Sequence, residues 1–330
     1  MLPSVAEIPA DSRRQKAAAL FDLLANVPNS IAVVEKVLEI WPEHAAYLFT
    51  NFQARSPAMM AAAEAAATAA RRLMNGREIS YAADYRWTCD RLREEELHFH
   101  RNGRYRLSSY AAAETEVYSD AQYMARYING LLLTQVLWFN HVGTLEMFLS
   151  RFLAAAEEPF DYLEIGPGHG LMVYFVACAA ACRSIEAWDV SEVSISETRA
   201  ALRQLGVAKP VVLTAVDILK AELPDRAYDR IVISEVLEHL ERPEDALRKL
   251  RRVIRPNGRL FVNVPINSPS PDHIYLLSNP QDVGELVERA GFSVESMELF
   301  ATQGKPIEKA LKNKISISAG VIARVAPLKS

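Results

Sequence analysis

Glycines and acidic residues recur in the second half of the chain at spacings that suit the binding of a nucleotide-like ligand. Gly166, Gly168 and Gly170 lie between a short apolar run and a longer apolar segment. Glycine tolerates positive φ and lets a ligand approach the backbone closely, and the amides that open the following helix then face that ligand. Asp189 comes about 20 residues later, the spacing at which an acid accepts hydrogen bonds from ribose hydroxyls.

Short apolar runs that alternate with helix-forming segments must position these residues. This alternation predicts a parallel sheet with helices on both faces, a doubly wound α/β fold, and ligands of such folds bind at the carboxyl ends of the strands. The expected strands span residues 160–165, 184–189, 210–217, 228–235, 259–265, 292–300 and 315–325, and the expected helices span 171–178, 191–205, 243–254 and 279–290.

In this prediction the glycines and acids fall at the ends of four successive strands. The glycine loop follows the first strand, Asp189 ends the second, Asp217 ends the third, and Ser234-Glu235 ends the fourth. Since parallel strands present their carboxyl ends at the same edge of a sheet, we expect all of these residues at one edge. One acid at a strand end would carry little weight, whereas the ordered set predicts a binding site.

The composition argues against several other classes of protein. The chain has 330 residues, a net charge of −4 and no long basic block, so we expect no nucleic-acid partner. Its three cysteines form no CxxC, which argues against a disulfide framework or zinc site and fits a reducing cytoplasm. There is no apolar run of ~20 residues and no secretion-signal pattern near the N-terminus, so we expect a cytoplasmic protein without membrane contacts.

Residues from about 13 to 150 predict helices, apart from the stretch 97–107. There, two runs in which apolar and polar residues alternate flank Asn102-Gly103, the dipeptide most typical of a tight hairpin. Helices followed by a small hairpin predict a winged-helix-like module, and such a module is open to three interpretations: dimerisation, DNA binding, or a purely structural role. His98 and His100 alternate in the hairpin without a third ligand nearby, so we expect no metal there.

Residues from about 155 to 270 resemble a class I S-adenosylmethionine-dependent methyltransferase. The resemblance is carried by residues 163–170 (LEIGPGHG), Asp189, Asp217, 234–240 (SEVLEHL) and 253–258 (VIRPNG). A nicotinamide-binding Rossmann domain is the main rival, but its loop pattern is GxGxxG rather than GxGxG. The N-terminal half, with its expected wing, is similar to the dimerisation domain of small-molecule O-methyltransferases.

The resemblance implies a fold, a domain organisation and a cofactor. It implies a Rossmann-like sheet of seven mainly parallel strands in residues 151–330, preceded by a mostly helical, winged-helix-like domain in residues 1–150 that forms a homodimer. The cofactor would be S-adenosylmethionine, with its methionine portion on the glycine loop, its ribose on Asp189 and its adenine at Asp217. The cofactor-binding residues would be Glu164, Gly166, Pro167, Gly168, Gly170, Asp189, Val190, Asp217, Ile218, Ser234 and Glu235.

The chemistry of a sulfonium ion asks little of the protein beyond alignment of the nucleophile and exclusion of water. A general base helps when the acceptor is a hydroxyl, and His141, His239 and His273 are the candidates. Tyr174, on the first turn after the glycine loop, could turn its ring toward the sulfonium. We expect the catalytic residues to be Asn140, Tyr174 and His273, with Asp272 as a further substrate contact, and we expect no metal site.

Two reactions fit this set of residues. In the first, the enzyme methylates a small molecule of secondary metabolism held between the N-terminal helices and the loop 267–273. In the second, S-adenosylmethionine is itself the substrate and cyclises to azetidine-2-carboxylate with release of methylthioadenosine, since the layout also resembles methyltransferase-like azetidine synthases. A third interpretation is a cofactor-binding protein without catalytic activity.

Overall fold

The computed structural model describes residues 10–156, 158–223 and 225–327, and the chain divides into two compact units. The first unit comprises residues 1–146, 268–273 and 300–317, and the second comprises the remaining segments, 147–267, 274–299 and 318–330. Two short segments of the C-terminal half therefore belong with the N-terminal helices. A domain boundary at residue 150 stays a prediction. The N-terminal residues 1–9, where we expected no secretion signal, lie outside the described residues.

The first unit is built of helices. α4 is rich in alanine, and six of its alanines are almost completely buried, which lets α2 and α7 pack closely against it. Glu64 of α4 caps the start of α2, because its carboxylate accepts hydrogen bonds from the backbone N–H groups of Asn29 and Ser30, each at 2.8 Å. The elements are α1 (Ala10–Leu23), α2 (Pro28–Ile40), η1 (Pro42–His44), α3 (Ala45–Gln53), α4 (Pro57–Met74), α5 (Glu78–Asn102), α6 (Tyr110–Ala113), η2 (Glu114–Tyr118), α7 (Ala121–Leu137), α8 (Phe139–Met147), η5 (Thr302–Gly304) and α13 (Ile307–Lys312).

The predicted hairpin at residues 97–107 is wrong, and with it the winged-helix-like character of this unit. Helix α5 continues to Asn102, and no strand occurs among residues 10–156. Gly103 has a φ of 70° and its N–H donates to the carbonyl of Phe99, so the Asn-Gly pair ends a helix instead of turning a hairpin. The buried positions Glu95 and Phe99 lie four residues apart, a helical spacing that the sequence pattern concealed.

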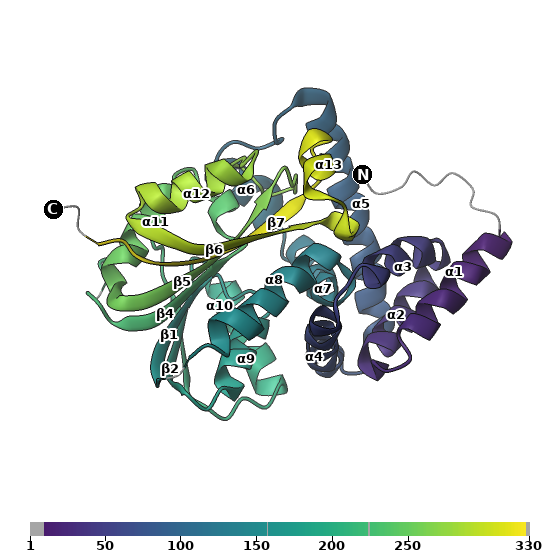
Figure 1. Ribbon diagram of the computed structural model, residues 1–330, viewed down its shortest axis with the longest axis horizontal. Helices are drawn as coiled ribbons and strands as arrows, with labels where there is room; N and C mark the ends of the chain where they lie inside the picture. Colours follow the sequence, from purple (N-terminus) through teal and green to yellow (C-terminus); the bar gives the residue numbers. More distant parts are fainter. Residues whose placement is uncertain (1–9, 157, 224, 328–330) are drawn as a thin grey trace. The chain divides into compact units, whose positions relative to one another are not determined.

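The second unit contains a seven-stranded sheet in the order β3-β2-β1-β4-β5-β7-β6. β1 pairs in parallel with β2 and β4, β2 with β3, and β4 with β5. Figure 1 shows α9 and α10 on one face of the sheet and α11 and α12 on the other. The elements are η3 (Phe148–Leu153), β1 (Phe160–Ile165), α9 (Leu171–Cys178), β2 (Cys182–Asp189), α10 (Glu192–Gln204), β3 (Val211–Ala215), β4 (Tyr228–Ser234), η4 (Leu237–His239), α11 (Pro243–Val253), β5 (Ile254–Ile266), α12 (Pro280–Arg289), β6 (Phe292–Ala301) and β7 (Ile317–Val325).

The doubly wound, Rossmann-like fold expected from the sequence is therefore confirmed. Its central strand β4 is covered on both faces, and Ile231, Val232 and Ile233 are fully buried, which explains an apolar run instead of an alternating one. Side-chain caps fix where helices begin: Ser191 accepts a hydrogen bond from the N–H of Ser194 at the start of α10. These local signals explain why the observed elements lie close to the expected ranges.

Four charged residues tie together the amino ends of the central strands. The Asp161 carboxylate accepts hydrogen bonds from Arg183 and Arg255, each at 2.8 Å, and Asp229 accepts from the same two guanidinium groups. Burial alone would raise the pKa of Asp161, but the hydrogen bonds from the arginines and from Ser184 outweigh it and hold that pKa at about 2. This network lies at the end of the strands opposite to the predicted site.

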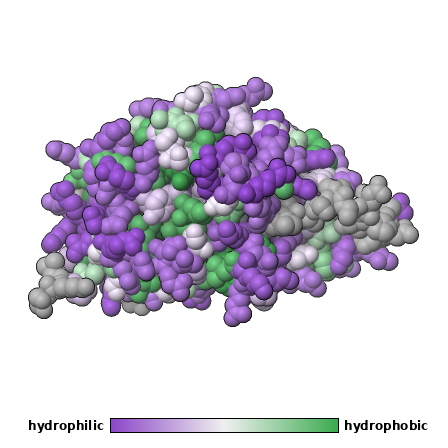
Figure 2. Space-filling model, turned by 90° about the horizontal axis from the view of Figure 1, so that it is seen from above, coloured by the Kyte–Doolittle hydropathy of each residue, from purple (hydrophilic) through white to green (hydrophobic). Residues whose placement is uncertain are grey.

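The surface is mixed in character. On the face shown in Figure 2, hydrophilic and hydrophobic residues are interspersed. Among the described residues, large hydrophobic side chains with more than a third of their area exposed include Val190 and Val193, which both follow the end of β2. None of the helices within the described ranges has the length and hydropathy needed to cross a membrane.

Candidate cofactor site

The carboxyl ends of β3, β2, β1 and β4 lie side by side, and the predicted residues lie at these ends. In the strand register Ile165 pairs with Trp188 on one side and with Ile233 on the other. Gly166, Asp189 and Ser234 each follow directly after one of these paired residues. The structure thus places the glycine loop, the acids and the polar turn at one edge of the sheet, as the sequence analysis expected.

The glycine loop has a backbone that side chains would disturb. Gly166, Gly168 and Gly170 have φ values of 69°, 50° and 73°. A methyl group added at Gly166 would lie 2.5 Å from the Cγ2 atom of Val236, so only glycine fits there. At Gly168, by contrast, no atom lies within 4 Å of the position of an added Cβ. The loop is therefore packed against the turn after β4 on one side and open at Gly168, where a ligand can approach.

Helix α10 braces the loop through Thr198. The Oγ1 atom of Thr198 lies 2.7 Å from the carbonyl oxygen of Gly168 and 2.9 Å from that of Ser194, and the residue is fully buried. Its hydroxyl proton is shared between these two acceptors. Thr198 was not among the predicted site residues, because a threonine inside an amphipathic helix carries no signal of such a contact.

Glu164 provides a buried carboxyl group directly before the loop. It is 3% exposed, and the Tyr162 hydroxyl donates a hydrogen bond to its Oε2 atom at 2.7 Å. Burial raises the pKa of Glu164 to about 8, although the hydrogen bond from Tyr162 acts in the opposite direction. The carboxyl group is thus poised to ionise when a cation arrives, as the ammonium group of an amino acid would.

Asp189 ends β2 with both carboxylate oxygens engaged by neighbouring residues. Oδ1 accepts a hydrogen bond from the N–H of Ser191 at 2.9 Å, and Oδ2 accepts one from the Ser194 hydroxyl at 2.8 Å. Burial raises the pKa of Asp189, and these two bonds only partly offset the rise. They also fix the orientation of the carboxylate, whose oxygens each keep a further lone pair for a ligand hydroxyl. Val190, next in the chain, is 53% exposed.

Asp217 and Ile218 follow β3. The Asp217 carboxylate accepts a hydrogen bond from the N–H of Leu219 and forms an ion pair with Lys220, both at 2.9 Å. Burial alone would raise the pKa of Asp217, but Lys220 and the backbone N–H groups outweigh it and lower that pKa. Asp217 is therefore an ionised acceptor suited to an exocyclic amine, and the buried Ile218 lies beside it.

The turn after β4 is strained. Glu235 has a φ of 53°, unusual for a residue with a side chain, and its N–H donates to the carbonyl of Asn263 at 2.9 Å. The Asn263 side chain in turn donates to the Ser234 hydroxyl at 3.1 Å. Asn263 was not among the predicted site residues, although it is the one polar residue in the apolar run 260–266.

Comparison with known proteins agrees with this geometry. Residues 163–262 match the family model described as "Methyltransferase domain", a stretch that contains every predicted cofactor-binding residue. This part of the chain is a methyltransferase domain. The chain is 34% identical over 124 residues to the ubiquinone/menaquinone biosynthesis C-methyltransferase UbiE of Azotobacter vinelandii. The aligned residues cover 36% of this chain and 49% of that protein.

A second relative comes from Mycolicibacterium smegmatis and is named "Probable S-adenosylmethionine-dependent methyltransferase". It is 30% identical over 144 residues, which cover 41% of this chain and 52% of that protein. The chain thus spans about half the length of these curated relatives.

Two solved structures also share similarity with the chain. The first is a SAM-dependent methyltransferase from Aquifex aeolicus, with a TM-score of 0.44, 18% identity and coverage of 66% of this chain and 99% of that one. The second is Burkholderia thailandensis 1,6-didemethyltoxoflavin-N1-methyltransferase, with a TM-score of 0.42, 19% identity and coverage of 54% of this chain and 76% of that one.

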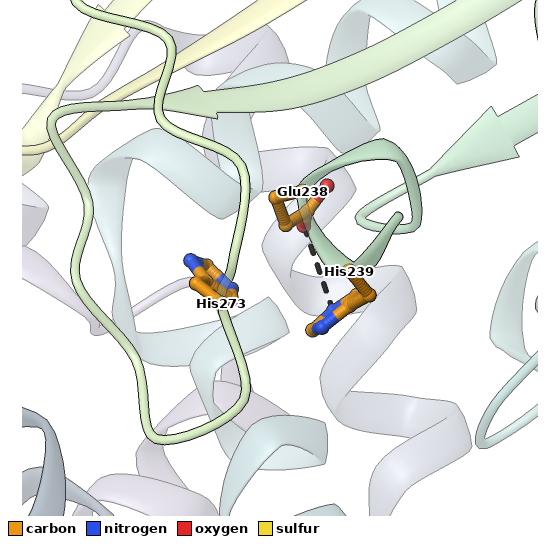
Figure 3. A group of neighbouring side chains, drawn as sticks. All are labelled: Glu238, His239 and His273. Atoms are coloured by element: carbon orange, nitrogen blue, oxygen red, sulfur yellow. Dashed lines mark ion pairs between the residues drawn. The ribbon is translucent and has the colours of Figure 1, made fainter. Parts of the chain in front are cut away.

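The methyltransferase domain also contains the Glu238-His239 pair, drawn in Figure 3. Glu238 is fully buried, and its carboxylate lies 3.8 Å from the Nε2 atom of His239. The backbone carbonyl of Glu238 accepts hydrogen bonds from the N–H groups of Ile274 and Tyr275, both at 2.9 Å. These contacts hold the turn η4 to the chain segment before α12, so the backbone of Glu238 has a structural role.

The predicted catalytic residues are divided between the two units. Tyr174 lies in the methyltransferase domain, half-buried on α9, where its N–H donates to the carbonyl of Gly170. Asn140 is 4% exposed on α8 of the first unit, and the neighbouring His141 has its Nδ1 atom 2.8 Å from the Thr134 hydroxyl. His273 also belongs to the first unit. The catalytic roles of Asn140, Tyr174 and His273 stay predictions.

Proposed function

We propose that the chain is an enzyme that transfers a methyl group from S-adenosylmethionine to a small-molecule acceptor. The observation that carries the proposal is the arrangement of the methyltransferase domain, in which the glycine loop, Asp189, Asp217 and Ser234 lie at four adjacent strand ends. When bound, S-adenosylmethionine supplies a methyl group on a sulfonium ion that is already activated toward nucleophiles.

The residues of the domain divide the binding of the cofactor among them. Glu164 and the backbone around Gly168 hold the amino-acid end, with Ser234 and Glu235 beneath the methionine portion. Asp189 accepts hydrogen bonds from the ribose hydroxyls, and the exposed Val190 beside it offers an apolar surface. Asp217 accepts from the adenine amine while Ile218 contacts the ring. The open backbone at Gly168 and the raised pKa of Glu164 both fit such a ligand.

His273 is the base that we propose for an acceptor that carries a proton. Its Nδ1 atom lies 2.7 Å from the carbonyl oxygen of Ser268, and a carbonyl only accepts, so Nδ1 carries the proton of the neutral ring. Nε2 then holds the lone pair that accepts a proton. Asn140 and Tyr174 are proposed to contact the sulfonium and amino-acid end of the cofactor. We also propose that the protein acts in secondary metabolism, that it is cytoplasmic and that it forms a homodimer through the helical unit.

Titration calorimetry tests the cofactor site. Asp189→Ala removes charge-assisted hydrogen bonds and should weaken S-adenosylmethionine binding by about 1.5–3 kcal/mol. Asp225→Ala is the matched control, because Asp225 is an exposed aspartate of the same domain with 74% of its side chain accessible. Equal affinities of the two variants would show that Asp189 does not hold the ribose.

Product analysis tests the reaction. The wild-type protein is incubated with S-adenosylmethionine, with and without a panel of small hydroxyl and amine compounds, and the nucleoside products are separated by mass spectrometry. S-adenosylhomocysteine that forms only with an acceptor supports methyl transfer. Methylthioadenosine formed without an acceptor would contradict it and favour cyclisation to azetidine-2-carboxylate, whereas tight binding without any turnover would favour a non-catalytic protein.

A further inference from the structure

Three tyrosine hydroxyls of the first unit hold alternate residues of the loop 268–273. Ser268 donates its backbone N–H to the Tyr105 hydroxyl at 3.2 Å. The Tyr127 hydroxyl lies 2.5 Å from the Ser270 hydroxyl, and the Tyr118 hydroxyl donates to Asp272 Oδ2 at 3.4 Å. The tyrosines come from three places, after α5, at the end of η2 and within α7, so the loop is held from several elements of the same unit.

Asp272 is the centre of these contacts. It is 5% exposed, and the Ser270 hydroxyl donates to its Oδ1 atom at 2.7 Å. Because the Ser270 proton points to the carboxylate, the Ser270 oxygen accepts from the Tyr127 hydroxyl, which gives the relay Tyr127 to Ser270 to Asp272. The Tyr127 hydroxyl also lies 3.5 Å from Asp272 Oδ1, so Tyr127 reaches the carboxylate directly as well. Hydrogen bonds to a charged acceptor are stronger than neutral ones, and a buried carboxylate depends on them. The relay therefore fixes the loop at Asp272.

The same loop determines the orientation of His273. Its Nδ1 atom donates to the carbonyl oxygen of Ser268. The backbone N–H of the same serine donates to Tyr105, so both backbone groups of Ser268 take part in the contacts of the loop. The His273 N–H donates to the carbonyl of Ser270 at 3.3 Å, and the Tyr105 ring makes a T-shaped contact with the imidazole, with 5.8 Å between centroids. The prolines at positions 269 and 271 restrict the backbone between these contacts.

We propose that Tyr127 and Asp272 are positioning residues that hold His273 in the tautomer with a proton on Nδ1 and a lone pair on Nε2. They act through the loop and not by contact with a substrate. The positioning itself can be tested without turnover, whereas its catalytic consequence rests on the proposed function. In sites that use a general base, the base is commonly oriented by a further group.

Nuclear magnetic resonance of the imidazole nitrogens tests the positioning directly. The protein is labelled with ¹⁵N-histidine, and the His273 signals are assigned by their loss in His273→Gln. We expect a single Nδ1–H tautomer in the wild type and a mixture of tautomers in Tyr127→Phe and Asp272→Asn. Tyr123→Phe is the matched control, since within the described part of the chain the hydroxyl of Tyr123, also on α7, makes no hydrogen bond. An unchanged tautomer in Tyr127→Phe would overturn the proposal.

Steady-state kinetics then test the consequence. Tyr127→Phe and Asp272→Asn should lower kcat by about tenfold or more while KM for S-adenosylmethionine stays unchanged, because general-base catalysis contributes on this scale. If Asp272→Asn fails to fold, Tyr127→Phe decides, since it loses only one hydroxyl. Failure of the wild type to turn over any acceptor would refute the proposed function but leave the tautomer measurement valid, so the two failures are distinguishable. A changed tautomer with an unchanged kcat would overturn the catalytic part.

Discussion

Glu164→Gln isolates the electrostatic state of the candidate site before any ligand binds. The carboxyl group of Glu164 is 3% exposed, and burial raises its pKa from 4.5 to about 8 in the folded protein. The folded state thus holds this proton more tightly than the unfolded chain does. Stability from this group is fully present below about pH 4.5 and is lost as the pH rises toward 8, because the unfolded chain releases the proton first. Glutamine cannot ionise, so the variant escapes this loss.

The size of the effect follows from the shift in pKa. At about 1.4 kcal/mol per unit, the wild type should lose roughly 2–3 kcal/mol between pH 6 and pH 9 from this group alone. The assay is urea unfolding of the ligand-free protein at several pH values. The difference in unfolding free energy between Glu164→Gln and wild type should grow with pH by that amount. Glu192→Gln, a change at an exposed glutamate of α10, should run parallel to the wild type.

A second measurement links this residue to the cofactor. If the ammonium group of S-adenosylmethionine meets Glu164, binding expels the carboxyl proton. Titration calorimetry near pH 7 in buffers of different ionisation enthalpy should then detect proton release by the wild type that is absent in Glu164→Gln. Parallel stability curves of the two proteins from pH 6 to pH 9 would refute the reasoning at its first step, since Glu164 would then ionise normally.

Three further predictions concern other elements. Gly166→Ala places a methyl group 2.5 Å from Val236 and imposes a φ of 69° on alanine. It should therefore lower both the melting temperature and the affinity for S-adenosylmethionine, which thermal-shift assays measure. Adding Val236→Ala to this variant should restore only part of each, because the backbone strain remains. Glu64→Gln weakens the cap of α2 and should cost about 1–2 kcal/mol in urea unfolding. Asp161→Asn should remove stability that the wild type has above about pH 4 and loses as the pH falls toward 2, so acid unfolding of the variant should depend less on pH in that interval.

The second half of the chain could be predicted because local and global signals agree there. β4 contains the apolar run Ile231–Ile233, which is typical of a strand covered on both faces of a parallel sheet. Once the strands are placed, the positions of Asp189 and Asp217 at one edge follow from the topology alone. The glycine loop needed no further information, because the φ values of its glycines are a property of the turn itself.

The failures have equally specific causes. Asn102-Gly103 has two uses, as a hairpin turn and as a helix end, and the alternation of residues around it favoured the wrong one. Helix α5 buries Glu95 and Phe99 on one face, and burial is a tertiary property that the local sequence pattern does not contain. The contact of Tyr118 with Asp272 joins residues 154 positions apart, so no pattern of spacing could have indicated it.

The carboxyl groups at the sheet edge show what kind of ligand the site requires. Burial raises the pKa of both Glu164 and Asp189, which means that each charge is less well stabilised in the ligand-free protein than in water. A neutral apolar ligand would desolvate both groups further and would raise these pKa values again. A ligand with an ammonium group near Glu164 and hydroxyl donors near Asp189 would lower them and gain binding free energy from the same groups. The electrostatics of the folded chain therefore favour an amino-acid nucleoside over a purely apolar ligand.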